Sequence, residues 1–165
     1  MALNEETKVE EKLEQEQILD LNIPSIKKSK FRINGDANKV LELNISDMSI
    51  VKRLNRVYPK LQALAKKATT FDEKELNDNS DEALEAFANK LDDIDQDMRK
   101  LVDELFQSNV SELCCDDGTM YDLYGGMMRF EHIIETLAKL YENNFSSEFS
   151  KARARIQKHT SKYTG

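Results

Sequence analysis

The residues best suited to chemistry are few and scattered along this chain of 165 residues. Cys114 and Cys115 are adjacent, but no CxxC spacing accompanies them, and His132 belongs to a different expected element. Two neighbouring cysteines cannot form a disulfide framework, so a reduced setting fits them best. We therefore interpret both thiols as packing residues rather than as a redox or metal site.

His132 and Glu135 lie three residues apart on one expected helix. Di-iron bundles use the reverse order, Glu-x-x-His, and need a second copy of that motif on another helix. The sequence holds one further histidine, His159 near its end, and no HExxH motif. A packed or capping histidine is the simpler interpretation.

Acidic residues at Asp93, Asp95, Asp97 and Glu104 match four ligand positions of the twelve-residue calcium loop. That loop requires glycine for its sharp turn, where this chain has Met98 within a helical pattern. We therefore expect a solvated acidic helix face and no metal site. Neither the glycine-rich phosphate loop nor GxSxG is present. The sequence thus predicts no catalytic residue, no cofactor and no enzymatic activity.

The strongest pattern in the chain is an apolar heptad seam between Ser80 and Phe106. Its members are Leu84, Phe87, Leu91, Ile94, Met98, Leu101 and Leu105. No glycine or proline interrupts it, and Asn79 or Ser80 can cap its start. We expect a long, acidic helix with a narrow apolar stripe. Such a stripe needs one partner helix, either within this chain or in a second copy, so a homo-oligomer is one of two options.

A change of period predicts a β-hairpin at residues 30–45. Apolar and polar residues alternate on both sides of Asn34-Gly35, a pair that readily adopts positive φ. Helical spacing then runs from Met48 to Thr69, where Pro59 should kink or split the helix near Tyr58. The acidic face of the seam helix suggests antiparallel packing on this basic helix.

Helical spacing returns from Gly126 to about Asn143-Asn144, with one or two further amphipathic turns near Ile156. The predicted fold is therefore mainly α: a bundle of three to four helices with a small N-terminal β-hairpin. Its expected parts are an acidic, partly disordered arm at residues 1–28, a core domain at 29–145, and a basic C-terminal helix or tail at 146–165.

Two segments stand out as partner-binding candidates. Apolar residues around Pro24 form a short arm, for which packing on its own domain is favoured over docking on a neighbour. Residues 108–126 form a loop of unusual length, and such loops are often functional. The candidate residues are Ile18, Leu21, Ile23, Ile26, Met120, Tyr121, Tyr124 and Met127.

Charge and hydropathy narrow the class of protein. The net charge of −7 argues against general attraction to nucleic acid or to an anionic membrane. A nucleic-acid-binding regulator that uses Arg53, Arg56, Lys60 and the basic C-terminus is a third alternative, and an enzyme is the weakest. No apolar run reaches the length of a membrane helix, and the acidic N-terminus does not resemble a signal peptide, so we expect a cytoplasmic protein.

Three stretches resemble a known group of proteins. They are FRINGDANKVLELNISDMSIVKRLNRVYPKL at 31–61, GTMYDLYGGMMRFEHIIETLAKLYENN at 118–144, and the closing KHTSKYTG. Together they are similar to tail assembly chaperones from the tail-gene modules of long-tailed phages and prophages of Gram-positive bacteria. The resemblance covers about three quarters of the chain and excludes the first 28 residues. It lies in the overall pattern and carries no site motif.

The resemblance implies a non-enzymatic role in the host cytoplasm. Such a chaperone binds the tape measure protein and tail tube subunits during tail assembly, and leaves as the tube polymerises. A tape measure protein is a long helix with exposed apolar stripes, which suits an amphipathic helical partner. The rival interpretation is a permanent virion component, such as a tail or connector subunit.

Overall fold

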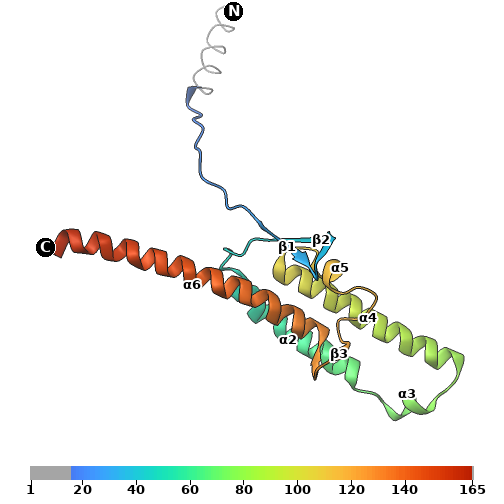
Figure 1. Cartoon of the computed structure of the whole chain (residues 1–165). Helices are drawn as coiled ribbons and strands as arrows, with labels where there is room; N and C mark the ends of the chain where they lie inside the picture. The colour runs from blue at the N-terminus through green and yellow to red at the C-terminus, as the bar shows by residue number, and fades with distance from the viewer. Residues whose placement is uncertain (1–15, 165) are drawn as a thin grey trace, which may run out of the picture.

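The computed structural model describes residues 16–164, and the side chains of these except at residues 76 and 159–164. The fold is mainly α-helical with a small N-terminal β-hairpin, as predicted (Figure 1). Most of the expected loose or disordered acidic segment, residues 1–15, lies outside the described residues. The apolar residues of the arm follow it and extend away from the helices (Figure 1).

The hairpin forms as its pattern predicts. Strands β1 (Ser29–Ile33) and β2 (Asp36–Leu43) pair antiparallel, with Phe31 opposite Leu41. Asn34 and Gly35 form the turn with φ values of 50° and 75°, the left-handed region that suits a tight hairpin. Because side chains alternate along a strand, Leu41 and Leu43 enter the core.

Helices α2 (Ile50–Thr69) and α4 (Asp81–Phe106) pack side by side and run antiparallel, joined by the short helix α3 (Glu73–Asn77). An ion pair between Arg56, near the start of α2, and Glu104, near the end of α4, reflects this arrangement. The prediction that Pro59 splits the helix is wrong, since α2 is continuous through it. Buried Val57 and Leu61 flank the proline and hold both sides of it in the core.

Helix α4 begins where predicted, because the Ser80 hydroxyl accepts a hydrogen bond from the Ala83 amide at 3.2 Å. The predicted seam is buried over only part of its length. Ile94 and Met98 are buried, whereas Leu84 is 54% exposed. Only the C-terminal half of the seam lies deep in the core.

Residues 108–126 do not form one long loop. They contain helix α5 (Val110–Cys114) and strand β3 (Leu123–Tyr124), which pairs with β4 (Met127–Met128). The turn between these strands is Gly125-Gly126, with φ values of 60° and 80°. Positive φ is easy for glycine, so this dipeptide makes a second hairpin that the sequence analysis missed.

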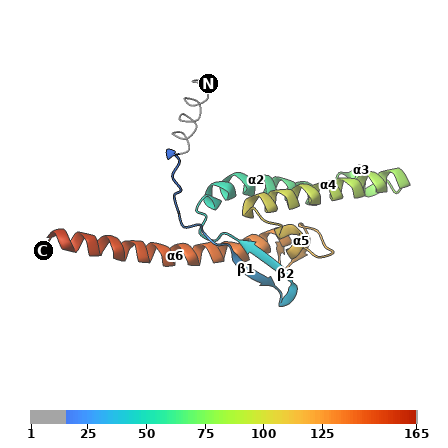
Figure 2. The same cartoon turned by 90° about the horizontal axis from the view of Figure 1, so that it is seen from above.

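Helix α6 (Arg129–Thr164) is one continuous element of 36 residues. Its predicted end at Asn143-Asn144 is wrong. The Asn144 side-chain amide donates a hydrogen bond to the Ile45 carbonyl oxygen at 3.1 Å, so it links the helix to the segment after β2 rather than capping it. Beyond this contact α6 projects from the rest of the molecule (Figure 2).

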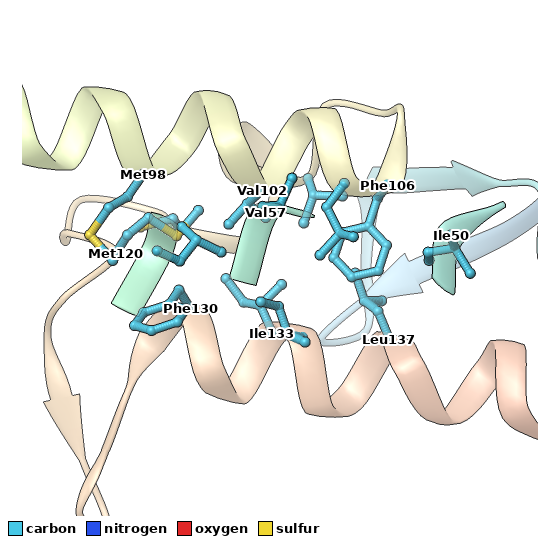
Figure 3. Close-up of a cluster of buried hydrophobic side chains, with 14 of the residues drawn as sticks. Ile50, Val57, Met98, Val102, Phe106, Met120, Phe130, Ile133 and Leu137 are labelled. Atoms are coloured by element: carbon cyan, nitrogen blue, oxygen red, sulfur yellow. The ribbon is translucent and has the colours of Figure 1, made fainter. Parts of the chain in front are cut away.

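The core lies between α4 and the first half of α6, closed by α2 and the hairpin (Figure 3). Met98 and Val102 come from α4, and Phe130, Ile133 and Leu137 from α6. Met120, from the segment between α5 and β3, is fully buried among them. The segment that connects α5 with α6 is therefore part of the core and fixes where α6 begins.

Candidate functional site

An apolar groove runs between α2 and α6. One end encloses about 340 Å³ and is closed by the C-terminal turn of α4. The adjoining part, of about 790 Å³, extends toward Pro59 and the β3–β4 turn. Val51, Leu54 and Ile134 line both parts, so we treat them as one site, the α2–α6 groove. Its other apolar lining residues are Ile50, Tyr58, Leu105, Phe106, Met127, Ala138, Tyr141, Phe145 and Phe149.

Two neighbouring faces of α2 explain the groove. Val57 and Leu61 are buried in the core. Val51, Leu54 and Tyr58 follow the three-to-four spacing of a second stripe on the same helix, and this stripe lines the groove. Val51 is 62% exposed. One side of α2 thus stabilises the fold, while the adjacent side leaves apolar surface available.

The wall contributed by α6 is aromatic at one end. Ring centroids of Phe106 and Tyr141 are 6.2 Å apart, those of Tyr141 and Phe145 6.2 Å, and those of Phe145 and Phe149 6.5 Å. These distances fit the tilted and edge-on packing that aromatic rings prefer. The row begins in the core and ends at Phe149, which is 47% exposed. The exposure of the aromatic side chains therefore increases along the row from the core to the solvent.

The rim of the groove on α6 is acidic. Glu131, Glu135 and Glu142 line it, and the Glu135 carboxylate lies 3.6 Å from the Lys139 ammonium. The Glu131 carboxylate accepts a hydrogen bond from the Met128 amide at 3.0 Å, which secures the start of α6. A ligand for this groove therefore meets an apolar floor and carboxylates along one edge.

Arg53 and Asp47 hold the closed end of the groove. The buried Arg53 guanidinium lies 2.8 Å from the Asp47 carboxylate and donates to the Leu105 carbonyl oxygen at 2.9 Å. The hydrogen bond from the Ser49 hydroxyl, followed by that from Arg53, lowers the pKa of Asp47. The assignment of Arg53 to an exposed phosphate-binding face is therefore wrong, because its charge is used inside the fold.

A second polar cluster forms around Asp95, one of the acidic residues that match the calcium-loop spacing. The buried Asp95 carboxylate accepts hydrogen bonds from the Met120 amide at 2.7 Å and from Arg99 Nε at 2.8 Å. Arg99 also donates to the Gly118 carbonyl oxygen at 2.7 Å. The expectation that Asp95 belongs to a solvated face is wrong. It anchors the segment that leads from α5 to β3.

The cysteines are packed as expected. Cys115 is buried and Cys114 half-buried, and both are free thiols. Burial raises the pKa of Cys114 to about 11 and also raises that of Cys115, so both thiols are protonated at neutral pH. At Cys115 burial outweighs the guanidinium groups of Arg99 and Arg129, which lie 3.3 Å and 3.7 Å from its Sγ and favour the thiolate.

His132 is a packed histidine, as predicted. Its Nε2 lies 2.7 Å from the Tyr124 carbonyl oxygen, to which it donates, and its ring stacks obliquely on Tyr124. It therefore links α6 to β3. Among the described side chains, no three His, Cys, Asp or Glu residues gather in a way that could hold a metal ion.

The structure separates the predicted partner-binding residues. Of these, only Met127 lines the α2–α6 groove. Met120 is fully buried and cannot belong to a surface, and Tyr121 is half-buried with its hydroxyl bonded to the Leu91 carbonyl oxygen at 3.1 Å. Tyr124 is 81% exposed at the hairpin tip. The periodicity of Val51, Leu54 and Tyr58 indicates a second apolar stripe on α2, but the position of α6 decides whether that stripe lines a groove.

The apolar arm does not pack on its own domain, which corrects the favoured expectation. Its four candidate residues are between 65% and 81% exposed. They are Ile18, Leu21, Ile23 and Ile26. Pro24 in their midst prevents a regular helix that could dock along the bundle.

Comparison with known proteins found no relative of this chain. No protein-family model matches the chain, and no curated protein or solved structure is significantly similar to it. Within residues 16–164, none of the helices has the length and apolar character needed to cross a membrane.

Proposed function

We propose that this chain is a non-enzymatic binding protein that holds an amphipathic helix of another protein in the α2–α6 groove. The observation that carries the proposal is the groove itself, an elongated apolar surface between two helices with exposed Val51 and Phe149 along it. Grooves of this kind accept helices that present apolar residues at three-to-four spacing.

The acidic rim defines the ligand further. Glu131, Glu135 and Glu142 favour a helix whose apolar stripe is flanked by lysine or arginine. Charges at a rim contribute more to the rate and register of binding than to affinity. Such a site suits a partner that is bound during a process and later released.

The particular role we propose is that of a phage tail assembly chaperone. The tape measure protein and tail tube subunits are its proposed partners, and the host cytoplasm is its proposed place of action. The support is the resemblance of residues 31–61 and 118–144 to that group, together with a groove suited to an apolar helix. A permanent tail or connector subunit is the alternative that the experiments must separate.

The groove is tested by co-expression with the tape measure protein encoded in the same gene module. We expect the wild-type chain to keep that protein soluble, and Val51→Glu to abolish the effect by placing a charge on the groove floor. The matched control is Val40→Glu, which changes another exposed valine, on β2. Failure of the wild-type chain, or full activity of Val51→Glu, would refute the proposal.

The chaperone role is tested by the fate of the chain. Quantitative mass spectrometry should find it abundant in the lysate and depleted from purified mature particles. A fixed copy number per particle would instead identify a structural subunit.

A further inference from the structure

The projecting half of α6 forms a basic surface with an apolar stripe. Every described side chain from Ser146 to Lys158 is exposed. We call the surface made by Phe149, Lys151, Ala152, Arg153 and Arg155 the basic end. Lys151 lies 3.3 Å from Glu148, the single acidic residue between 146 and 158. The surface therefore keeps a net positive charge.

The opposite surface lies at the start of α4. We call the surface made by Asp81, Leu84, Glu85 and Ala88 the acidic end, because three-to-four spacing places these exposed residues on one face of α4. The acidic side chains of this set are exposed, and no basic residue lies between Asp81 and Asn89. Leu84 is 54% exposed, and the Phe87 ring packs on Phe71, which is itself 44% exposed, at 5.5 Å between centroids. Leu84 and the exposed Ala88 form a short apolar strip bordered by the Asp81 and Glu85 carboxylates.

The two ends point away from each other. Both views place the end of α6 and the start of α4 at opposite extremities of the molecule (Figures 1 and 2). Because both surfaces lie on helices that extend from the same core, one chain cannot bring its own basic end onto its own acidic end. Their complementarity can be satisfied only between chains.

We propose that copies of this chain associate head to tail, with the basic end of one copy packed on the acidic end of the next. Phe149 and Ala152 would meet Leu84 and Ala88, while Arg153 and Arg155 face Asp81 and Glu85. This contact joins two different surfaces, so each copy retains one unused basic end and one unused acidic end. The association therefore continues beyond a dimer unless it closes into a ring.

The contact is small and charged, and both properties make it weak and sensitive to salt. Packing of a few helical turns buries less area than a typical stable interface. Exposed ion pairs are individually weak, and salt screens them further. The inference does not depend on the proposed function, because neither end belongs to the lining of the groove apart from Phe149.

Sedimentation velocity and small-angle X-ray scattering of the full chain test the proposal. We expect the mean mass to rise with protein concentration at about 50 mM NaCl and to fall toward that of the monomer at about 500 mM. Extended particles or closed rings of more than two copies support head-to-tail contact. A monomer under both conditions, or a dimer that does not grow, would overturn it.

Charge reversal identifies the two surfaces. Arg153→Glu/Arg155→Glu and, separately, Asp81→Lys/Glu85→Lys should each weaken association at least tenfold. All four changes in one chain should restore it, because the basic and acidic ends are then exchanged. A quadruple variant that stays monomeric while correctly folded, as judged by circular dichroism, would refute the pairing.

The matched control for the first variant is Lys52→Glu/Lys66→Glu, which changes net charge equally on exposed positions of α2. It should retain self-association. If it loses association as strongly, net charge rather than the two ends governs the behaviour, and the proposed contact is wrong.

Discussion

Arg53 shows how a charged residue can serve the fold of this chain. Its guanidinium joins the start of α2 to the end of α4 through Asp47, the Ser49 hydroxyl and the Leu105 carbonyl oxygen. Removing one partner from a buried pair leaves the other groups without compensation, which costs more than the pair contributes. These contacts hold the start of α2 against the end of α4, where Leu105 lines the groove.

Arg53→Ala should lower the free energy of unfolding by about 3 kcal/mol. Arg56→Ala, which removes an exposed ion pair with Glu104 on the same two helices, should cost at most about 1 kcal/mol. Urea denaturation of both variants measures the difference. Equal losses would mean that burial of the Arg53 contacts does not matter.

The pKa of Asp47 predicts how stability depends on pH. It lies below the ordinary value of 3.8, because the hydrogen bonds from Ser49 and then Arg53 favour the ionised carboxylate in the folded state. This contribution is complete above the unfolded-state pKa and disappears as the pH falls through the lower folded-state pKa. Asp47→Asn should therefore be less stable than wild type at pH 7, with a gap that narrows below about pH 4. Urea denaturation across this pH range measures the gap, and a constant gap would contradict this origin.

Helix α4 behaves as two halves at the scale of the element. Its buried residues all lie between Ile94 and Phe106, while the side chains of its N-terminal half are half-buried or exposed. The same heptad pattern thus has two physical outcomes along one helix. A seam residue contributes to stability only where another element covers it.

Met98→Ala should destabilise the chain by about 2–5 kcal/mol, because it leaves a cavity in a closed core. Leu84→Ala, at the same kind of heptad position but 54% exposed, should cost less than about 1 kcal/mol. Thermal and urea denaturation distinguish these values. A large loss at Leu84 in a dilute monomer would show that the N-terminal half of the seam is covered.

Helix α6 divides the whole molecule into a packed body and a projecting rod. Tyr141 is buried and Phe145 half-buried, whereas the described side chains beyond them are exposed. Body and rod differ in what they contribute: the first half of α6 closes the core and lines the groove, and the second half presents charge and apolar surface. Helical periodicity alone is the same in both halves.

A chain that ends after Ser150 should keep the midpoint of thermal unfolding within a few degrees of wild type, because the removed side chains at 151–158 are exposed. Its helical circular dichroism should fall in proportion to the residues lost. Ending the chain after Lys139 is the contrasting variant, since it removes buried Tyr141 and the Asn144 contact, and it should unfold the protein. Equal stability of both truncated chains would contradict this division.

The local elements followed from the sequence because their causes are local. The Asn34-Gly35 turn, the Ser80 cap and the apolar spacing of α2, α4 and α6 each depend on residues close together in the chain. Where a predicted helix boundary differs from the structure, the cause is a contact with a residue far away in the chain. The predicted helix end at Asn143-Asn144 is absent, and the Asn144 side-chain amide instead donates to the Ile45 carbonyl oxygen, 99 positions away in the chain.

The groove and the fate of the charged residues were decided by the tertiary structure. The spacing of Val51, Leu54 and Tyr58 predicts an apolar stripe on α2. It does not indicate whether another helix covers this stripe, because that depends on where α6 lies. Likewise, the sequence pattern predicts that Asp95 and Arg53 are surface charges. In the fold Asp95 accepts a hydrogen bond from the Met120 amide, and Arg53 donates one to the Leu105 carbonyl oxygen. Sequence determined which faces are apolar and which ends are charged; only the packing of α6 against α2 and α4 determined which of them remain available for binding.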